Sequence, residues 1–452
     1  MEPGQKLPST ILVIFGITGD LSRRYLLPAL AEICANTEIG KDFRVLGVSR
    51  RQVDLNNVLG AKEKNLKAYS QMLTMDLANR SDYQKLKDEI GALSQKFTQG
   101  PQVIFYLSVP PAAADGIVGL LGESGLSQPP AKLLLEKPFG YDLSSAQEMI
   151  GRIAKYFSQE QVYRIDHYLA KESAQNIAVF LGSNALFRNI WSNQFIDHID
   201  IVAAEDIGIG GRKEFWEATG MLRDFVQSHL LQLAALTLME PCSHMFDFAQ
   251  LPERRLAALQ KMKIAELKSA VRGQYRGYRQ EVGNPNSAVD TFVSLTLDSS
   301  DSRWRGVPIR LTTGKKLDQK LTKIDIHFKK SQEAEANLLT LRLHPREGIE
   351  LDLWVKEPGY RHNLQKQPLR FIYEQRFGRV PEAYEQVLID AMRAKKSLFA
   401  SSEEVLTSWK ILQPVLDYWS MSDSDLKIYQ PGSTIEEVLQ QRAETKEPKT
   451  DN

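Results

Sequence analysis

Residues 164–172 combine side chains that can bind an anion with side chains that can move a proton; they read Arg-Ile-Asp-His-Tyr-Leu-Ala-Lys-Glu. A helix that begins near His167 would place His167, Tyr168 and Lys171 around one turn. Free N–H groups and the positive end of the helix dipole favour a phosphate there, and the three side chains would add donors. Asp166 points differently and would be free to orient a base from another segment. A polar helix start with solvated charges is the alternative.

A second histidine, His229, lies in a stretch with helical periodicity that runs from about Thr219 to Met239. The positions on its side of the helix are apolar: Leu222, Phe225, Val226, Leu230 and Leu233. A histidine that faces a core is either a hydrogen-bonded structural residue or a base that titrates near neutral pH. The periodicity alone leaves both roles open.

The segment after the first predicted strand has the pattern of a phosphate-binding turn. The apolar run Ile11–Phe15 predicts a buried parallel strand, and Gly16-Ile17-Thr18-Gly19-Asp20-Leu21 and a helical pattern follow it. Strand, glycine turn and helix form the dinucleotide-binding arrangement. Thr18 and Leu21 occupy two places where glycines would be expected, so a plain turn is the competing interpretation.

Two arginines follow the next predicted strand, Arg44–Val48, which ends in Ser49-Arg50-Arg51. An Asp or Glu at this place would hold a ribose diol, whereas arginines suit the 2′-phosphate of NADP. A solvated pair of loop arginines is the alternative.

Lys137 follows a further strand, Lys132–Leu135, next to the strand Val103–Ser108. Ligands of an open α/β sheet bind beyond the carboxyl ends of its strands, which places Lys137 at the site. A surface lysine at a turn is the alternative. Because bonds before proline have an appreciable cis population, the Lys137–Pro138 bond is a candidate structural switch.

The remainder of the chain indicates a second domain rich in strands. We expect a strand over Phe195–Val202, helices that include Leu251–Val271, and then short strands separated by turn residues. These strands are Thr291–Leu297, Val307–Thr312, Lys323–Phe328, Leu338–Leu343 and Ile349–Val355. Such a run predicts a mainly antiparallel sheet, large enough to serve as a dimer surface. Helices are expected at Ala383–Met392 and Ser402–Ser420, followed by a polar tail.

The composition limits the class of protein. A chain of 452 residues suggests two or three domains. Its 57 Lys and Arg against 56 Asp and Glu argue against nucleic acid as a partner. Cys34 and Cys242 lie far apart without metal-ligand spacing, so we expect no metal site and a reducing cytoplasm. The longest apolar runs fall short of a membrane span, and no export signal is recognisable.

Taken in order, these motifs resemble those of the glucose-6-phosphate dehydrogenase family. Residues 164–172 resemble the family signature, with Ala170 where glycine is usual. The other shared motifs are Gly-x-x-Gly-Asp-Leu, Phe-Tyr-Leu-x-x-Pro-Pro, Glu-Lys-Pro-Phe-Gly, Leu-Leu-Gln after a histidine, Trp-x-Gly-Val-Pro, Gly-Lys and Pro-Glu-Ala-Tyr-Glu. The resemblance extends from about Ile11 to Ile435.

The resemblance implies a fold and an activity. We expect an NADP-binding Rossmann-like domain over residues 1–163, a substrate-binding β+α domain with a large, mainly antiparallel sheet over 164–441, and a disordered tail over 442–452. The implied reaction is the oxidation of D-glucose 6-phosphate at C1 to 6-phospho-D-glucono-1,5-lactone, the first oxidative step of the pentose phosphate pathway. NADP is the expected acceptor, with NAD as the alternative. The resemblance also implies a cytoplasmic homodimer, or a dimer of dimers, formed through the sheet.

The resemblance assigns roles residue by residue. His229 corresponds to the general base and Asp166 to its partner. The phosphate-binding positions are His167, Tyr168 and Lys171. Lys137 bridges substrate and cofactor, and the sugar-binding positions are Glu205, Glu217 and Lys315. The cofactor positions are Gly16, Thr18, Gly19, Asp20, Leu21 and Arg50, together with Lys137.

Physical chemistry supports this assignment. Oxidation of a hemiacetal needs a base for the C1 hydroxyl proton, and an aspartate on the other ring nitrogen of a histidine fixes its tautomer. In this context His229 is favoured as the base over a structural role. Phosphate binding remote from C1 supplies binding energy that positions the sugar.

Four residues depart from the family pattern: Glu217 for aspartate, Ser228 for asparagine, Thr312 for arginine and His344 for glutamine. These changes leave the chemistry in place but affect hexose selectivity, and we predict no second, structural cofactor site. The rivals are a related sugar or hexose-phosphate oxidoreductase with other selectivity and a non-catalytic homologue that regulates an active enzyme. Retention of His229, Asp166, Lys171 and Lys137 disfavours the second rival.

Overall fold

The computed structural model describes residues 7–36, 43–241, 248–330 and 335–441, so the predicted tail and Cys242 lie outside the described residues. The described residues form two compact units. The first contains the residues up to Gly140, Ser144–Ala170 and Pro381–Ser402, and the second contains Tyr141–Leu143, Lys171–Val380 and the residues from Glu403 onward. In these ranges no helix is both long and apolar enough to cross a lipid bilayer.

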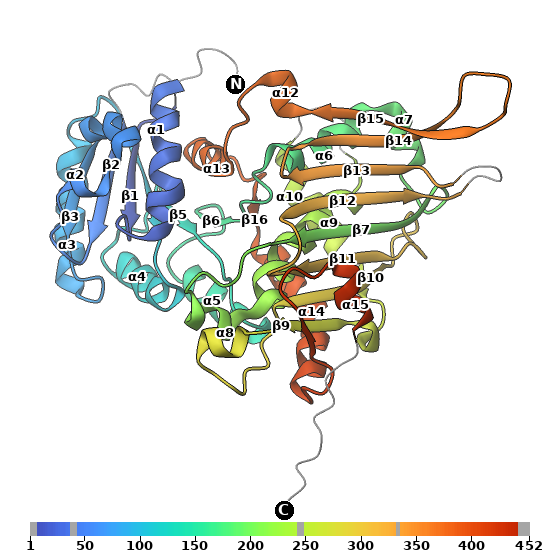
Figure 1. The fold of residues 1–452 in the computed structure, drawn as a ribbon. Coiled ribbons are helices and arrows are strands. Elements are labelled where there is room, and N and C mark those ends of the chain that lie inside the picture. Colours follow the sequence, from blue (N-terminus) through green and yellow to red (C-terminus); the bar gives the residue numbers. More distant parts are fainter. Residues whose placement is uncertain (1–6, 37–42, 242–247, 331–334, 442–452) are drawn as a thin grey trace, which may run out of the picture. The chain divides into compact units, whose positions relative to one another are not determined.

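A seven-stranded sheet forms the centre of the first unit (Figure 1). Its strands are β1 (Thr10–Phe15), β2 (Phe43–Ser49), β3 (Ser70–Thr74), β4 (Gln102–Leu107), β5 (Lys132–Leu135), β6 (Val162–Ile165) and β16 (Phe399–Ala400). They lie in the order β16-β6-β5-β4-β1-β2-β3, and all pairs are parallel except β16 with β6. β1 thus lies between β2 and β4, where the strand order of a doubly wound sheet reverses. The predicted Rossmann-like fold is confirmed.

Helices bury both faces of this sheet. They are the π-helical η1 (Ser22–Leu26), α1 (Leu27–Asn36), α2 (Leu55–Val58), the 3₁₀ helix η2 (Ala61–Tyr69), α3 (Arg80–Ser94), α4 (Pro111–Glu123), α5 (Leu143–Ala154) and α13 (Ala383–Met392). Apolar residues of α1 and α13 share one core cluster with Leu12 and Ile14 of β1. Ile11, Val13 and Phe15 alternate with them and are equally buried. Burial on both faces explains why β1 is apolar along its whole length.

A ten-stranded sheet forms the second unit (Figure 1). Its strands are β7 (Ile196–Ala204), β8 (Met262–Ile264), β9 (Val271–Tyr275), β10 (Phe292–Ser299), β11 (Ile309–Gly314), β12 (Leu321–Phe328), β13 (Leu338–His344), β14 (Gly348–Lys356), β15 (Leu364–Ile372) and β17 (Lys427–Tyr429). The order is β15-β14-β13-β12-β7-β11-β10-β9-β17, with β8 paired to β10. The pairs β7–β11 and β9–β17 are parallel and the others antiparallel, so the mainly antiparallel sheet is confirmed.

The second unit also contains helices, one of which packs on β7. They are α6 (Glu172–Ser183), α7 (Ala185–Ile190), α8 (Lys213–Met221), the π-helical η3 (Leu222–Leu230), α9 (Leu231–Leu238), α10 (Leu251–Leu259), α11 (Tyr278–Val282), α12 (Tyr373–Phe377), α14 (Ser402–Ser420) and α15 (Ile435–Gln440), with short 3₁₀ turns at Phe248–Gln250 and Leu267–Ser269. η3 contacts β7 and β11. Ile199 and Ile201 of β7 are fully buried, whereas His198 and Asp200, which alternate with them, are half-buried on the other face.

Two expectations about local structure are wrong. The helix expected over Leu251–Val271 ends at Leu259, because β8 and β9 pair with β10 instead and tertiary pairing overrides a weak helical pattern. β15, which contains Pro368, was not predicted. It lies at the edge of the sheet, where a strand tolerates a proline.

An ion pair in the interior of the second unit joins α10 to α14. Arg255 Nε lies 2.8 Å from Glu404 Oε1, and the two side chains are 1% and 0% exposed. Removal of one partner would take the closest opposite charge from a buried group, which costs more than the pair contributes.

We predict that Arg255→Met lowers the free energy of unfolding by about 3–5 kcal/mol, measured by urea titration. Adding Glu404→Leu should recover most of this loss, because no unpaired charge then remains. The matched control is Lys261→Met, which breaks the pair with Asp301 (2.9 Å, lysine 49% exposed). This change should cost less than about 1 kcal/mol. A double variant as unstable as Arg255→Met would contradict the prediction.

Candidate active site

The turn after β1 has the backbone form of a phosphate-binding loop. Gly16 has φ 79°, and a Cβ at this position would lie 2.2 Å from the carbonyl oxygen of Ser108. The Gly19 N–H donates to Gly16 O (2.9 Å), and a helix begins at Asp20 and continues through η1 and α1. Only glycine fits at position 16, and the free N–H groups of the helix start face the edge where β1 ends. The structure thus gathers five predicted cofactor residues in one turn: Gly16, Thr18, Gly19, Asp20 and Leu21.

Arg50 lies beside this turn. β2 pairs in parallel with β1, with Val48 opposite Phe15, so the residues that follow Ser49 are next to the glycine turn. Arg50 and Arg51 are exposed, and the Arg51 N–H donates to Ser49 Oγ (3.2 Å). The exposed guanidinium groups are placed as the predicted 2′-phosphate site requires.

Lys137 stands at the carboxyl end of β5, as predicted, and its bond to Pro138 is cis. The preceding residue, Glu136, has a role that the sequence did not reveal. Its buried carboxylate accepts hydrogen bonds from the hydroxyls of Tyr106 and Tyr384. Burial raises the pKa of Glu136 to about 7, although the two tyrosine hydrogen bonds act in the opposite direction. A carboxyl group that titrates near neutral pH at this edge of the sheet is a typical feature of an active site.

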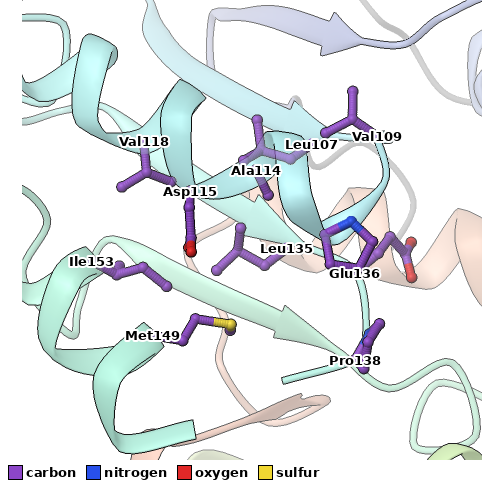
Figure 2. Close-up of a pocket in the computed structure, with 11 residues that line it drawn as sticks. Leu107, Val109, Ala114, Asp115, Val118, Leu135, Glu136, Pro138, Met149 and Ile153 are labelled. Carbon is purple, nitrogen blue, oxygen red and sulfur yellow. The ribbon is translucent and has the colours of Figure 1, made fainter. Parts of the chain in front are cut away.

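A small crevice between α4, α5 and the sheet adjoins this carboxyl group (Figure 2). Its lining is mostly apolar: Leu107, Val109, Pro111, Ala114, Val118, Leu135, Pro138, Met149 and Ile153, with Asp115 and Glu136 as the ionisable members. Asp115 is paired with Arg152 at 2.7 Å. Figure 2 shows the Glu136 carboxylate directed away from Val118 and Ile153. Without convergent polar groups, the crevice lacks the donors that a sugar phosphate needs.

The prediction of a helix that begins near His167 is wrong. β6 ends at Ile165, residues 167–170 form turns, and α6 begins only at Glu172. The cause is local, because Asp166 Oδ1 accepts the Tyr168 N–H (2.9 Å). Such a side-chain bond competes with helix formation.

The turn nevertheless groups Asp166, His167 and Tyr168 near the tyrosine that binds Glu136. The His167 ring stacks on Tyr384, with 6.2 Å between ring centroids, and meets Tyr168 edge-on at 5.0 Å. Asp166 and Tyr168 are buried. Three of the predicted site residues therefore lie in one part of the first unit.

Lys171 belongs to the second unit, where it is the N-cap residue of α6. Its Nζ donates to the carbonyl oxygen of Leu343 (3.3 Å) at the end of β13. The pKa of the next residue, His344, lies below its usual value because of burial and of the positive charges of Lys320 and Lys171. His344 is thus kept as a neutral donor or acceptor beside the predicted phosphate-binding lysine.

His229 is completely buried in η3. Its ring meets Phe225 edge-on, with 5.4 Å between centroids. π-helical turns such as η3 occur frequently at functional sites, because the wider turn changes the direction of its side chains. The predicted helix is therefore present, but a kink at Gly220 (φ 66°) separates α8 from η3.

Asp290, which the sequence did not single out, holds the start of this helix. Its Oδ2 accepts the Leu222 N–H (2.7 Å), and its carbonyl oxygen accepts the Met221 N–H (2.9 Å). Burial raises the pKa of Asp290 to about 6, against the effect of the Leu222 N–H. A Cβ at Gly220 would lie 2.6 Å from Asp290 Oδ1, so glycine is required there. Together these residues fix the helix that carries His229.

Two of the predicted sugar-binding residues meet directly. Lys315 Nζ lies 2.5 Å from Glu205 Oε2, and the two side chains are 1% and 19% exposed. The same ammonium group lies 4.5 Å from the centroid of the Trp216 ring. The parallel pairing of β7 with β11 brings this lysine and glutamate together.

The third, Glu217, is engaged separately. Its carboxylate accepts hydrogen bonds from Tyr278 Oη (2.9 Å), Asn284 Nδ2 (2.7 Å) and Ser287 Oγ (2.7 Å). Two other departures from the family pattern are structural in this fold. Ser228 Oγ donates to Asp224 O (2.8 Å), and Thr312 shares a hydrogen bond with Ser294 (2.9 Å).

Comparisons with known proteins cover nearly the whole chain. It matches the family models "Glucose-6-phosphate dehydrogenase, NAD binding domain" over residues 13–176 and "Glucose-6-phosphate dehydrogenase, C-terminal domain" over 178–449. It is 36% identical to glucose-6-phosphate 1-dehydrogenase of Chlamydia muridarum over 93% of this chain and 92% of that protein. It is 40% identical to the Chlamydia trachomatis protein of the same name over 79% of this chain and 89% of that protein.

Solved structures agree with these sequence matches. A glucose-6-phosphate dehydrogenase in complex with its substrate glucose 6-phosphate superposes with a TM-score of 0.89 at 27% identity, over 98% of this chain and 99% of that one. Glucose-6-phosphate 1-dehydrogenase from Mycobacterium avium gives a TM-score of 0.82 at 29% identity, over the same shares of the two chains. The chain therefore belongs to the glucose-6-phosphate dehydrogenase family.

Proposed function

We propose that this protein oxidises D-glucose 6-phosphate at C1 to 6-phospho-D-glucono-1,5-lactone, with NADP as the acceptor. The match to both domains of one enzyme family along nearly the whole chain carries this conclusion. A relative with the same fold binds glucose 6-phosphate as its substrate. Retention of the four residues named for the chemistry argues against a non-catalytic homologue; they are His229, Asp166, Lys171 and Lys137.

The residues at the edge of the first sheet fit a dinucleotide. Gly16 permits the tight turn after β1, because a Cβ there would clash with the carbonyl oxygen of Ser108, and the helix start at Asp20 supplies N–H groups for a pyrophosphate. Arg50 beside the turn would bind the 2′-phosphate of NADP. When bound, the nicotinamide accepts the hydride that leaves C1.

His229 acts as the base in this proposal. It takes the proton of the C1 hydroxyl while C1 becomes a carbonyl carbon, so the loss of proton and hydride together forms the lactone. Full burial removes competing water from the imidazole. Asp166 orients the ring and stabilises the imidazolium, a pairing that stays a prediction.

The other proposed residues hold the substrate. His167, Tyr168 and Lys171 bind the phosphate, whose binding energy positions C1. Lys137 bridges substrate and cofactor, while Glu205, Glu217 and Lys315 bind sugar hydroxyls.

The organisation of the protein is also a proposal. We place the NADP-binding domain at residues 1–163 and the substrate domain at 164–441. We infer a homodimer or dimer of dimers formed through the ten-stranded sheet, whose strands β14 and β15 carry exposed apolar side chains such as Val355, Leu364 and Leu369. A cytoplasmic location is expected from the cysteine content alone.

We predict nicotinamide reduction, followed by absorbance, when the protein is given glucose 6-phosphate and NADP. Glucose without the phosphate should react far more slowly, because the phosphate supplies much of the binding energy. Other hexose phosphates and NAD test selectivity in the same assay. Absence of reduction with every phosphosugar would overturn the proposed function.

We further predict that His229→Asn lowers kcat by at least about 100-fold, the lower range for loss of a general base. Glucose 6-phosphate should still bind to the variant, measured by calorimetry, because the phosphate site is intact. His362→Asn, an exposed histidine, is the control and should leave kcat unchanged. A normal kcat of the His229→Asn enzyme would contradict the role of His229 as the base and leave it a structural role.

Arg50→Ala should raise KM for NADP by about 10-fold or more and leave KM for NAD nearly unchanged. The reason is that a charged hydrogen bond to the 2′-phosphate contributes about 1.5–3 kcal/mol and NAD lacks this group. Arg80→Ala on α3, an exposed arginine 3.6 Å from Glu123, is the control. Equal losses with the two cofactors would contradict a 2′-phosphate role.

A further inference from the structure

A cluster of two histidines and an aspartate lies on the outward face of the ten-stranded sheet. His198 and Asp200 belong to β7, and His327 belongs to β12, directly opposite His198 in the antiparallel register. In the single chain their side chains are 27%, 21% and 28% exposed in the same order. No step of the proposed reaction uses these residues.

The three side chains converge on one point. His327 Nε2 lies 3.4 Å and His198 Nε2 lies 3.8 Å from the same oxygen, Asp200 Oδ2. The imidazole rings lie face to face with 4.0 Å between centroids. The candidate ligand atoms lie within 4.8 Å of one another. Ligands at about 2.0–2.1 Å from a tetrahedral zinc ion are about 3.3 Å apart, so the two parallel rings must turn out of their stack for both Nε2 lone pairs to point at one ion.

The neighbouring Asp197 carboxylate is placed to orient the His198 ring as a metal ligand. Asp197 Oδ2 lies 2.8 Å from His198 Nδ1. If Nδ1–H donates to this carboxylate, the lone pair is on Nε2, the atom that faces Asp200. In most metal sites, a histidine ligand donates its other ring N–H to a carboxylate or a carbonyl oxygen, and this hydrogen bond orients the ring.

The polar atoms of the cluster are incompletely satisfied. In the part of the chain that the structure describes, His327 Nε2 and Asp200 Oδ1 are shielded from solvent, and each has only a long polar contact: His327 Nε2 lies 3.4 Å from Asp200 Oδ2, and Asp200 Oδ1 lies 3.5 Å from Arg310 Nε. Buried polar atoms without partners are rare and often mark the place of an ion or water. This observation is independent of the spacing of the three side chains.

The surrounding charges also favour a cation. Asp197, Asp200 and Asp325 are negative; Asp325 stands opposite Asp200 on β12. The nearby positive groups are Arg310, whose Nε is 3.5 Å from Asp200 Oδ1, and Lys323, which pairs with Asp325 at 2.6 Å. Three negative groups against two positive ones leave an excess of one negative charge.

We propose that His198, Asp200 and His327 bind a divalent transition-metal ion of the zinc class, with a solvent molecule in the fourth position. Two imidazoles and one carboxylate suit Zn²⁺ and its neighbours, whereas Mg²⁺ and Ca²⁺ prefer oxygen ligands. The ion would join β7 to β12 in the middle of the sheet. The site therefore adds a metal-dependent constraint to the fold and takes no part in hydride transfer.

Equilibrium dialysis of the full-length protein with Zn²⁺ tests the proposal. We expect saturable binding that His198→Gln and His327→Gln each weaken at least about 10-fold, since even loss of an outer-shell partner has an effect of this size. His362→Gln, outside the cluster, is the matched control. Arg310→Gln should tighten binding, because it removes a competing cation from Asp200, and a merely destabilised protein would not show this gain. Thermal melting of each variant verifies that it is folded.

A second measurement needs no variant. Zn²⁺ should protect His198 and His327 of the unmodified protein from acylation by diethyl pyrocarbonate, detected by mass spectrometry, while His362 stays reactive. Mg²⁺ at the same concentration should not protect them. Unchanged Zn²⁺ affinity in both histidine variants, or equal acylation with and without Zn²⁺, would overturn the proposal.

Discussion

The alternation of side chains along β7 is the constraint on which the chemistry of the second unit depends. Ile199 and Ile201 face the helices, including the π-helical segment that carries His229, while His198 and Asp200 face outward. At the end of the strand, the Glu205 N–H donates to Gly314 O (2.9 Å), which sets this glutamate beside Lys315. A register shift of one residue would bury the polar pair and expose the two isoleucines. One strand thus fixes the core, the sugar-binding pair and the histidine cluster.

In the first unit, three separate motifs meet at one carboxyl group. Tyr106 comes from Phe-Tyr-Leu, Glu136 from Glu-Lys-Pro and Tyr384 from Pro-Glu-Ala-Tyr-Glu, and the two hydroxyls bind the one carboxylate. Because burial raises the pKa of Glu136 to about 7, this group changes charge in the neutral range. Its folded-state pKa lies above the ordinary value, so it favours folding at low pH and loses that contribution as the pH rises towards 7. The cluster therefore links the sheet edge, the Lys137 turn and α13 electrostatically.

The sequence predicted those features that depend on local pattern. The apolar run of β1, the glycine turn after it and the buried face around His229 follow from periodicity and from steric rules for glycine. The helix at His167 was wrong because Asp166 is compatible with both a helix start and a side-chain turn, and only the bond to the Tyr168 N–H selects between them. Glu136 was missed because its raised pKa is caused first by burial, which depends on the folded structure around it. The register between β7 and β12, which places His327 opposite His198, could not be predicted from the sequence either.

The structure divides the three proposed sugar-binding residues into two kinds. The Glu217 carboxylate already accepts three hydrogen bonds, from Tyr278, Asn284 and Ser287, so these partners fix its position. Its extra methylene relative to aspartate is therefore accommodated by a rigid set of donors, and the carboxylate has little freedom to follow a different sugar. Lys315 and Glu205 form a pair beside Trp216, in which both charged groups retain further hydrogen-bonding capacity. If the proposed sugar contacts are made, selectivity among hexose phosphates should thus depend on how the sugar hydroxyls fit the Glu217 carboxylate.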